Sequence, residues 1–211
     1  NRKWFATHIM QCSFNSMMQG TVYTGDFDMW WSDDGQAVRN SVLRAMSGGP
    51  IYISDKLGRS IKETIMPTVL SDGKILRLKN PAYPSYDCLL DNPKESGGLF
   101  KVFNTHNDCG ILSVFNIDTA ERCVSGRVSA NDMRLDTAKD YCVYDWFAKK
   151  AFKLYANDSF ELSLTDYDDF RLYLFVPIEN GKAVIGLADK YMSVASFDKK
   201  GNLSSDGLKL N

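Results

Sequence analysis

Residues 43–55, LRAMSGGPIYISD, decide the fold class that the sequence predicts. Apolar residues recur at near-helical spacing between positions 38 and 46, and Gly48-Gly49-Pro50 then ends the helix. Residues 50–54 (PIYIS) follow as a short buried strand, with Asp55 at its carboxyl end. A helix that leads directly into a strand is typical of a parallel α/β fold, in which functional sites gather at the carboxyl ends of the strands.

The flanking segments continue the same alternation of helix and strand. We expect a helix over residues 8–18, a second short strand over residues 21–23, and an amphipathic helix over residues 61–70 that Pro67 kinks. Two parallel strands can neither close a barrel nor cover their own hydrophobic faces. The α/β part, residues 1–80, is therefore predicted to be incomplete.

The pattern changes after a proline-marked connector, Asn80-Pro81-Ala82-Tyr83-Pro84. Short strands follow one another, and Phe160, Leu162 and Leu164 alternate with polar neighbours as in a strand with one solvated face. Residues 81–211 are therefore predicted to form an antiparallel β-sandwich. The expected strands cover residues 99–104, 110–117, 142–144, 151–155, 160–164, 172–176, 183–188 and 192–197.

Composition excludes several classes of protein. The 211-residue chain is 44% hydrophobic and 24% charged, as soluble globular proteins are. A net charge of −1 disfavours nucleic acid as a partner, and no apolar run is long enough to cross a membrane. The five cysteines form no C-x-x-C pair and only two histidines are present, so we expect reduced thiols, a cytoplasmic location and no metal. The glycine pairs lack the context of a phosphate-binding loop, so no cofactor is predicted.

Residues 25–35, GDFDMWWSDDG, combine carboxylates with aromatic side chains. In a strand, Asp26 and Asp28 would point to the same side, where they could bind magnesium or calcium, act as a glycosidase acid pair, or accept hydrogen bonds from sugar hydroxyls. Neighbouring positions on one strand lie too close together for the two catalytic acids of a glycosidase, which favours sugar binding or support for it. Trp30 and Trp31 could either stack on a pyranose ring or pack in the core.

Other polar residues have structural explanations. Asp33 and Asp34 suit the capping of the next helix, and Asp55 could either enter a pocket or cap a turn. His8 falls within a helical pattern and has no evident nucleophile nearby in sequence, so we interpret it as structural; Cys12 is interpreted as a buried small hydrophobe.

A series of motifs, taken in chain order, is similar to that of one enzyme family. The motifs are Gln19-Gly20, Gly25-Asp26-Phe27-Asp28-Met29, residues 43–55, residues 72–77 (DGKILR), residues 86–93 (YDCLLDNP), residues 100–104 (FKVFN) and Phe115-Asn116. They resemble glycoside hydrolase family 36, and more closely its branch of raffinose synthases and related bacterial α-galactosidases. The series covers roughly the first half of the chain and is more specific than any single motif in it.

The resemblance implies a (β/α)8 barrel followed by a C-terminal antiparallel β domain, and retaining chemistry on α-galactosides by two aspartates. It implies that both catalytic aspartates lie upstream of Asn1, so that this chain holds no catalytic residue. Asp28 and Met29 match the Asp-Met pair that touches galactose in this enzyme clan, and Asp26 matches a supporting aspartate. With Trp30 and Asp55, these are the expected substrate-binding residues.

Two departures from the plant raffinose synthases bear on the reaction. Phe27 stands where those enzymes carry Trp between the two aspartates, and residues 30–34 (WWSDD) replace a segment that contains His. We therefore expect hydrolysis rather than transfer to sucrose: the C-terminal portion of a retaining α-galactosidase-like enzyme, inactive on its own. The expected partners are an α-galactoside oligosaccharide and the upstream half of the barrel, and oligomerisation is left open. The alternatives are a galactosyl transferase of the raffinose-synthase type and a non-catalytic carbohydrate-binding or structural module.

Overall fold

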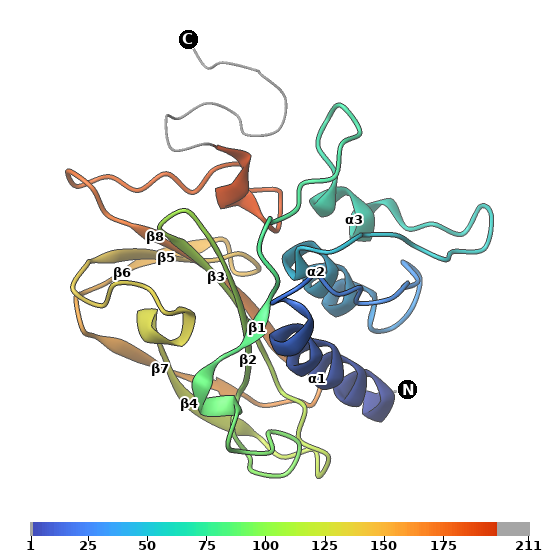
Figure 1. The fold of residues 1–211 in the computed structure, drawn as a ribbon, viewed down its shortest axis with the longest axis horizontal. Coiled ribbons are helices and arrows are strands. Elements are labelled where there is room, and N and C mark those ends of the chain that lie inside the picture. Colours follow the sequence, from blue (N-terminus) through green and yellow to red (C-terminus); the bar gives the residue numbers. More distant parts are fainter. Residues whose placement is uncertain (1, 198–211) are drawn as a thin grey trace.

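The computed structural model describes residues 2–197, in which three α-helices precede eight β-strands (Figure 1). The helices are α1 (Arg2–Gln19), α2 (Ala37–Ser47) and α3 (Lys62–Ile65). The strands are β1 (Tyr83–Pro84), β2 (Phe100–His106), β3 (Cys109–Phe115), β4 (Val124–Ser129), β5 (Tyr141–Asp145), β6 (Lys150–Leu154), β7 (Ser159–Leu164) and β8 (Phe170–Pro177). Short 3-10 helices lie at Met66–Thr68 (η1), Tyr86–Cys88 (η2), Ala130–Met133 (η3) and Ser193–Ser196 (η4).

The strands form two antiparallel sheets. The larger has six strands in the order β1-β2-β3-β8-β5-β6, and the smaller pairs β4 with β7. The hairpin from β2 to β3 turns at Asn107-Asp108, where Asn107 adopts a φ of 55°. Asparagine tolerates this left-handed conformation better than most residues, which is why the turn forms there.

The central strands of the large sheet, β2, β3 and β8, are buried on both faces. Along β3, Ile111 and Phe115 enter one hydrophobic cluster, whereas Leu112 and Val114 enter a second. Because successive strand residues point to opposite sides, these two clusters lie on opposite faces of the sheet. The β4–β7 sheet and η3 supply the partners on the second face, including Val128, Leu162 and Met133. Burial on both faces explains why these strands read as nearly continuous apolar runs.

Helices α1 and α2 lie on the other face of the sheet (Figure 1). Phe5 of α1 packs edge to face on Phe115 of β3, with ring centroids 6.3 Å apart. Asn104 of β2 donates from Nδ2 to the carbonyl of Met46 at 2.6 Å, so a side chain of the sheet satisfies a carbonyl near the end of α2. The hydrophobic core is therefore shared between the helical part and the sheet.

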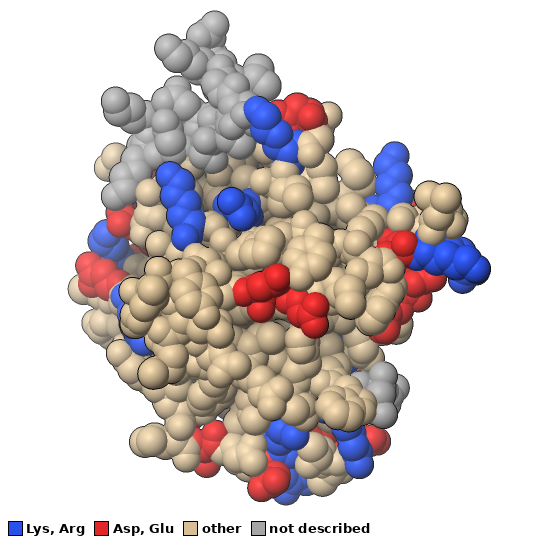
Figure 2. Space-filling model, turned by 45° about the vertical axis from the view of Figure 1, so that its right-hand side comes forward, with Lys and Arg blue, Asp and Glu red and all other residues tan. Residues whose placement is uncertain are grey.

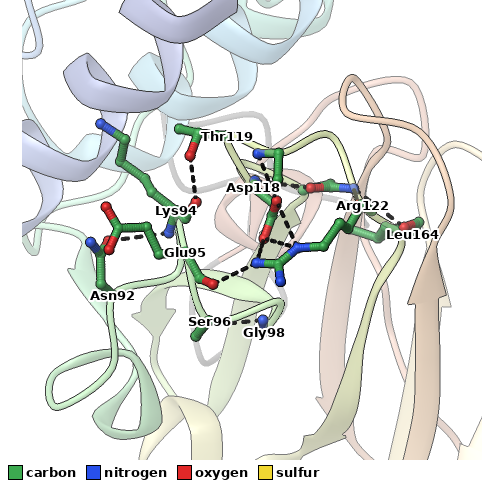
Figure 3. Close-up of polar contacts among 11 residues, drawn as sticks. Asn92, Lys94, Glu95, Ser96, Gly98, Asp118, Thr119, Arg122 and Leu164 are labelled. Atoms are coloured by element: carbon green, nitrogen blue, oxygen red, sulfur yellow. Dashed lines mark hydrogen bonds and ion pairs between the residues drawn. The ribbon is translucent and has the colours of Figure 1, made fainter.

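A polar cluster joins the loop before β2 to the loop after β3 (Figure 3). The buried carboxylate of Asp118 is held by Arg122 at 2.6 Å, and Arg122 also donates to the carbonyl of Glu95 at 2.5 Å. Lys94 reaches Thr7 of α1 with its Nζ atom at 2.9 Å, while its carbonyl accepts from the backbone N–H of Thr119 at 2.8 Å. These bonds connect α1 with two loops at one end of the sheet.

Several expectations for the first 80 residues need correction. The helix over residues 8–18 is confirmed within the longer α1, but residues 21–23 form an exposed turn whose N–H groups bond back to α1, as Tyr23 does to the carbonyl of Gln19 at 2.8 Å. The helix expected over residues 61–70 ends at Ile65 and continues only as η1, because Pro67 has no N–H to donate. Residues 50–54 make only one bridge, a parallel pairing of Ile53 with Trp30.

The β-rich part agrees better with the prediction. Six of the eight expected strands have counterparts, namely β2, β3, β5, β6, β7 and β8, whereas β1 and β4 were not expected. Residues 183–188 and 192–197 are not strands: the first segment is irregular and the second contains η4. At Gly186 φ is 93°, and its backbone lies against the carbonyl of Ser193, so the chain folds on itself there rather than extending. All regular sheet within residues 2–197 is antiparallel, and the (β/α)8 barrel and the division at residues 80/81 stay predictions. Over the same residues, no helix combines the length and apolar character needed to span a bilayer.

Candidate functional site

A pocket of about 280 Å³ lies between α1, α2 and the segment that follows α1. Helix α1 contributes Trp4 and His8, helix α2 contributes Asn40 and Arg44, and residues 28–31 form the third side. Three of the five predicted site residues therefore meet there, namely Asp28, Met29 and Trp30. Asp26 and Asp55 do not line the pocket.

The backbone at Asp28 is left-handed, with a φ of 66°. Residues 24–29 are irregular, so Asp26 and Asp28 are not neighbours on one face of a strand as expected. Instead Oδ1 of Asp26 accepts the N–H of Asp28 at 2.7 Å, and Oδ2 of Asp26 accepts the Tyr52 hydroxyl at 2.7 Å. Both carboxylate oxygens of Asp26 are therefore engaged in holding the segment, and its role in supporting sugar binding stays a prediction.

Asp28 and Met29 lie at the exposed edge of the pocket. Oδ1 of Asp28 accepts the N–H of Met29 at 2.7 Å, and in the described part of the chain Oδ2 has no hydrogen-bond partner. The Met29 sulfur accepts the Ser54 hydroxyl at 2.7 Å. Oδ2 of Asp28 is thus the carboxylate oxygen available to a ligand.

The two adjacent tryptophans differ in exposure. Trp30 is only 1% exposed, and its indole N–H has no acceptor among residues 2–197. Trp31 is 47% exposed and Trp4 is 72% exposed. The flat apolar faces at the pocket therefore come from Trp31 and Trp4, of which Trp4 was not expected, because its place beside Asp28 depends on how α1 packs.

Asp55 belongs to a different set of contacts. Its Oδ1 and Oδ2 atoms accept the N–H and the hydroxyl of Ser32 at 2.7 and 2.5 Å. Although partial burial opposes the effect, these hydrogen bonds lower the pKa of Asp55. Asp34 does line the pocket, but its Oδ1 accepts the N–H of Gln36 at 2.5 Å. Gln36 is itself the N-cap of α2 and α2 has no side-chain cap hydrogen bond, so the prediction that Asp33 and Asp34 cap this helix is wrong.

Arg44 lies beneath the edge of the pocket and is 2% exposed. Its Nε atom donates to the carbonyl of Asp28 at 3.1 Å, and Nη2 lies 3.0 Å from Nε2 of His8. Burial lowers the pKa of Arg44 to about 10, and burial together with the Arg44 charge lowers the pKa of His8. Sequence reasoning did not select Arg44; the one local signal was a charged residue placed among the apolar positions of a helix.

The lining can bond to a ligand that both donates and accepts hydrogen bonds. Asp28 offers an acceptor, the Gln36 amide carries N–H donors, and Trp31 adds an apolar face. Figure 2, which brings the helical side forward, shows a largely uncharged surface with a small group of acids near its centre. In the part of the chain that the structure describes, no three His, Cys, Asp or Glu side chains are arranged to hold a metal ion.

Residues 2–199 match the family described as raffinose synthase or seed imbibition protein Sip1. The chain belongs to this family. The resemblance inferred from the ordered motifs is therefore confirmed.

Relatives and one solved structure extend this result. The chain is 35% identical over 121 residues to galactinol–sucrose galactosyltransferase of Pisum sativum, covering 57% of this chain and 15% of the relative. It is 30% identical over 210 residues to the enzyme of that name from Oryza sativa subsp. japonica, covering 86% and 27%. The chain thus spans about a quarter or less of the length of these relatives. A Bacillus halodurans protein assigned as an α-N-acetylgalactosaminidase shares the fold, with a TM-score of 0.56, 10% identity, and 83% of this chain and 44% of that chain covered.

Proposed function

We propose that the chain supplies part of the galactose-binding wall of an enzyme that transfers α-galactosyl groups between sugars. The observation that carries the proposal is the free Oδ2 atom of Asp28 at the edge of a pocket, in a chain of the raffinose synthase family. The chain would form the C-terminal portion of that enzyme.

A neutral sugar suits the chemistry of this lining. Pyranose hydroxyls donate to carboxylates and accept from N–H groups, and the ring offers a C–H face to an indole. Asp28 and Trp31, three residues apart in the chain, provide the carboxylate and the indole. An anionic ligand is disfavoured, because Asp28 and Asp34 both face the same pocket.

The two catalytic carboxylates are proposed to come from polypeptide outside this chain. A retaining mechanism needs two carboxyl groups about 5 to 5.5 Å apart on either side of the scissile bond. Asp26 and Asp55 are both held by hydrogen bonds from the segments around them, and neither lines the pocket. Asp28 therefore serves as a binding carboxylate.

Transfer is favoured over the hydrolysis expected from the sequence. The relatives are named as galactosyltransferases, and a stachyose synthase of Pisum sativum is 28% identical over 198 residues. Phe27 and the Trp-rich segment motivated the expectation of hydrolysis. Phe27 is 2% exposed, so its side chain packs in the core and does not contact an acceptor sugar.

Two measurements on the full-length protein test the proposal. Incubation with galactinol and sucrose should yield a trisaccharide in excess of free galactose, and no trisaccharide should form when sucrose is left out. Free galactose as the only product would support the hydrolase. Asp28→Ala should lower kcat/KM for the galactosyl donor about tenfold or more. Asp33→Ala is a matched control, because Asp33 is exposed, contacts Arg59 at 3.6 Å and does not line the pocket. Equal kinetics in the two variants would refute the assignment of Asp28.

A carbohydrate-binding module without chemistry is a second candidate. A cavity of about 290 Å³ beside η3 and the turn from β6 to β7 is lined by Tyr155, which is 61% exposed, and by Asn131 and Asn157. Exposed aromatic and amide groups are typical of sugar-binding surfaces. Calorimetric titration of the 211-residue chain with raffinose and melibiose tests this candidate: saturable binding that Tyr155→Ala abolishes would support it.

A further inference from the structure

Arg44 makes an unusual set of contacts for a buried cation. Its Nε and Nη2 atoms donate to the carbonyls of two successive residues, Asp28 at 3.1 Å and Met29 at 3.4 Å. Its Nη1 atom donates to Oδ1 of Asn40 at 2.5 Å. Within residues 2–197 Arg44 takes part in no ion pair, and all of these acceptors are neutral.

A buried charge without an ion pair is energetically costly. The hydrogen bonds of Arg44 therefore indicate a role that an apolar residue could not fill. Only arginine presents several N–H groups in one rigid plane, which lets it bind two neighbouring carbonyls and Asn40 at once. The hydrogen bonds to the carbonyls of Asp28 and Met29 fix the orientation of the peptide unit between these two residues. That peptide unit determines where the Asp28 side chain points.

The conformation that Arg44 holds is one that aspartate rarely adopts. The φ of 66° at Asp28 places its backbone in the left-handed region, which costs energy for a residue with a Cβ atom. The N–H of Met29 binds Oδ1 of Asp28, so the carboxylate plane is defined as well. Without Arg44, the backbone could relax and Oδ2 would leave the edge of the pocket.

His8 supports the guanidinium group of Arg44. Because arginine only donates, the 3.0 Å contact between Nη2 and Nε2 of His8 requires an unprotonated Nε2 atom. The same nitrogen lies 3.1 Å from the carbonyl of Phe27, a contact that would need the other tautomer. With Nε2 unprotonated, the ring accepts one N–H of Nη2, while Nε and the other N–H of Nη2 hold the carbonyls of Asp28 and Met29.

We propose that Arg44 is a positioning residue. By holding the peptide between Asp28 and Met29 through hydrogen bonds, it orients the Asp28 carboxylate toward the bound sugar. This inference rests on the proposed function. It assigns to Arg44 an effect that passes through the Asp28 side chain and therefore disappears when that side chain is removed.

The test is a double-mutant cycle in the full-length protein, with Asp28→Ala and Arg44→Lys as the single changes. Arg44→Lys should lower kcat/KM for a galactosyl donor about tenfold in the parent protein, and by less than about threefold when Asp28 is already Ala. Arg39→Lys is the matched control: Arg39 is a buried arginine on the same helix, bound to Asp168 at 2.7 Å and outside the pocket. It should change the melting temperature but show no coupling to Asp28→Ala.

The outcomes separate the inference from the proposed function. No effect of Asp28→Ala would overturn the proposed function and the inference together. A loss in Asp28→Ala combined with full additivity of Arg44→Lys would overturn the positioning role alone. Should Arg44→Lys fail to fold, Asn40→Ala replaces it, because it removes the acceptor of Nη1 and leaves the guanidinium. Additivity of Asn40→Ala with Asp28→Ala would equally overturn the positioning role.

Discussion

Both carboxylate oxygens of Asp55 accept hydrogen bonds from Ser32, one from its backbone N–H at 2.7 Å and one from its hydroxyl at 2.5 Å. The Ser32 hydroxyl in turn accepts the N–H of Ile61 at 2.7 Å. These bonds lie next to the parallel bridge between Trp30 and Ile53, and with it they join three segments that carry little regular structure of their own. Asp55 therefore acts as a structural tie beside the pocket.

Replacing Asp55 should affect the stability of the fold more than the binding of a sugar. We expect Asp55→Ala to lower the free energy of unfolding by about 1.5 to 3 kcal/mol, because two hydrogen bonds to a charged acceptor are lost. Urea denaturation measures this change, and Ser32→Ala should be non-additive with it. A donor kcat/KM that falls as far in Asp55→Ala as in Asp28→Ala would show instead that Asp55 binds the sugar.

Two buried tryptophans should respond differently to loss of the indole N–H. Trp146 donates from Nε1 to the carbonyl of Lys190 at 2.8 Å, whereas the N–H of Trp30 has no acceptor among residues 2–197. Because both changes shrink a buried ring, the lost hydrogen bond makes Trp146→Phe the more costly, by about 0.5 to 1.5 kcal/mol. Thermal and urea unfolding of the two variants provide the comparison. Equal losses would mean that the Trp30 N–H has found an acceptor.

The Asp118–Arg122 pair predicts a pH dependence of stability (Figure 3). Hydrogen bonds from Arg122 lower the pKa of Asp118 below its ordinary value. A depressed carboxyl pKa contributes stability that is fully present above the unfolded value of about 3.9 and is lost as the pH falls through the folded value.

We therefore expect Asp118→Asn to be less stable than the parent at pH 7, by about 1.5 to 3 kcal/mol. The difference should shrink as the pH falls below about 4. Urea midpoints measured from neutral to acid pH check this. Asp91→Asn is the control, since Asp91 is exposed and forms no ion pair among the residues described. A difference that stays constant with pH would contradict the linkage.

Two glycines in left-handed conformations distinguish backbone strain from steric conflict. At Gly58 φ is 78° and an added Cβ atom would meet nothing within 4 Å, whereas at Gly186 φ is 93° and a Cβ atom would lie 2.1 Å from the carbonyl oxygen of Ser193. Gly58→Ala should cost about 1 kcal/mol from the backbone alone. Gly186→Ala should cost clearly more, because the segment must also move away from η4. Similar melting temperatures in the two variants would contradict this packing.

The local sequence pattern was sufficient to predict most strands of the β-rich part. Strands β2, β3 and β8 combine apolar runs with β-branched and aromatic residues and are bounded by turn formers, so their positions follow from the sequence, although their ends differ from the prediction by one or two residues. Strand β4 was missed because Gly126 and Arg127 interrupt its pattern, and only its pairing with β7 makes it a strand. Residues 183–188 and 192–197 read as strands because they are apolar. Residues 192–196 are instead buried around η4, whereas residues 183–188 are irregular and only partly buried, with Val184 65% exposed.

The sequence by itself determined the family, through an ordered series of motifs, and the position of Asp28 as a candidate ligand of a sugar. Tertiary structure decided which carboxylates are free. Asp26 is engaged by Tyr52, 26 residues away, and Asp55 by Ser32, 23 residues away, while Arg44 and His8, 36 residues apart, meet beneath Asp28. Hydrogen bonds between residues this distant in the chain depend on how α1, α2 and the connecting segments pack, and no periodicity or spacing within one segment encodes that packing.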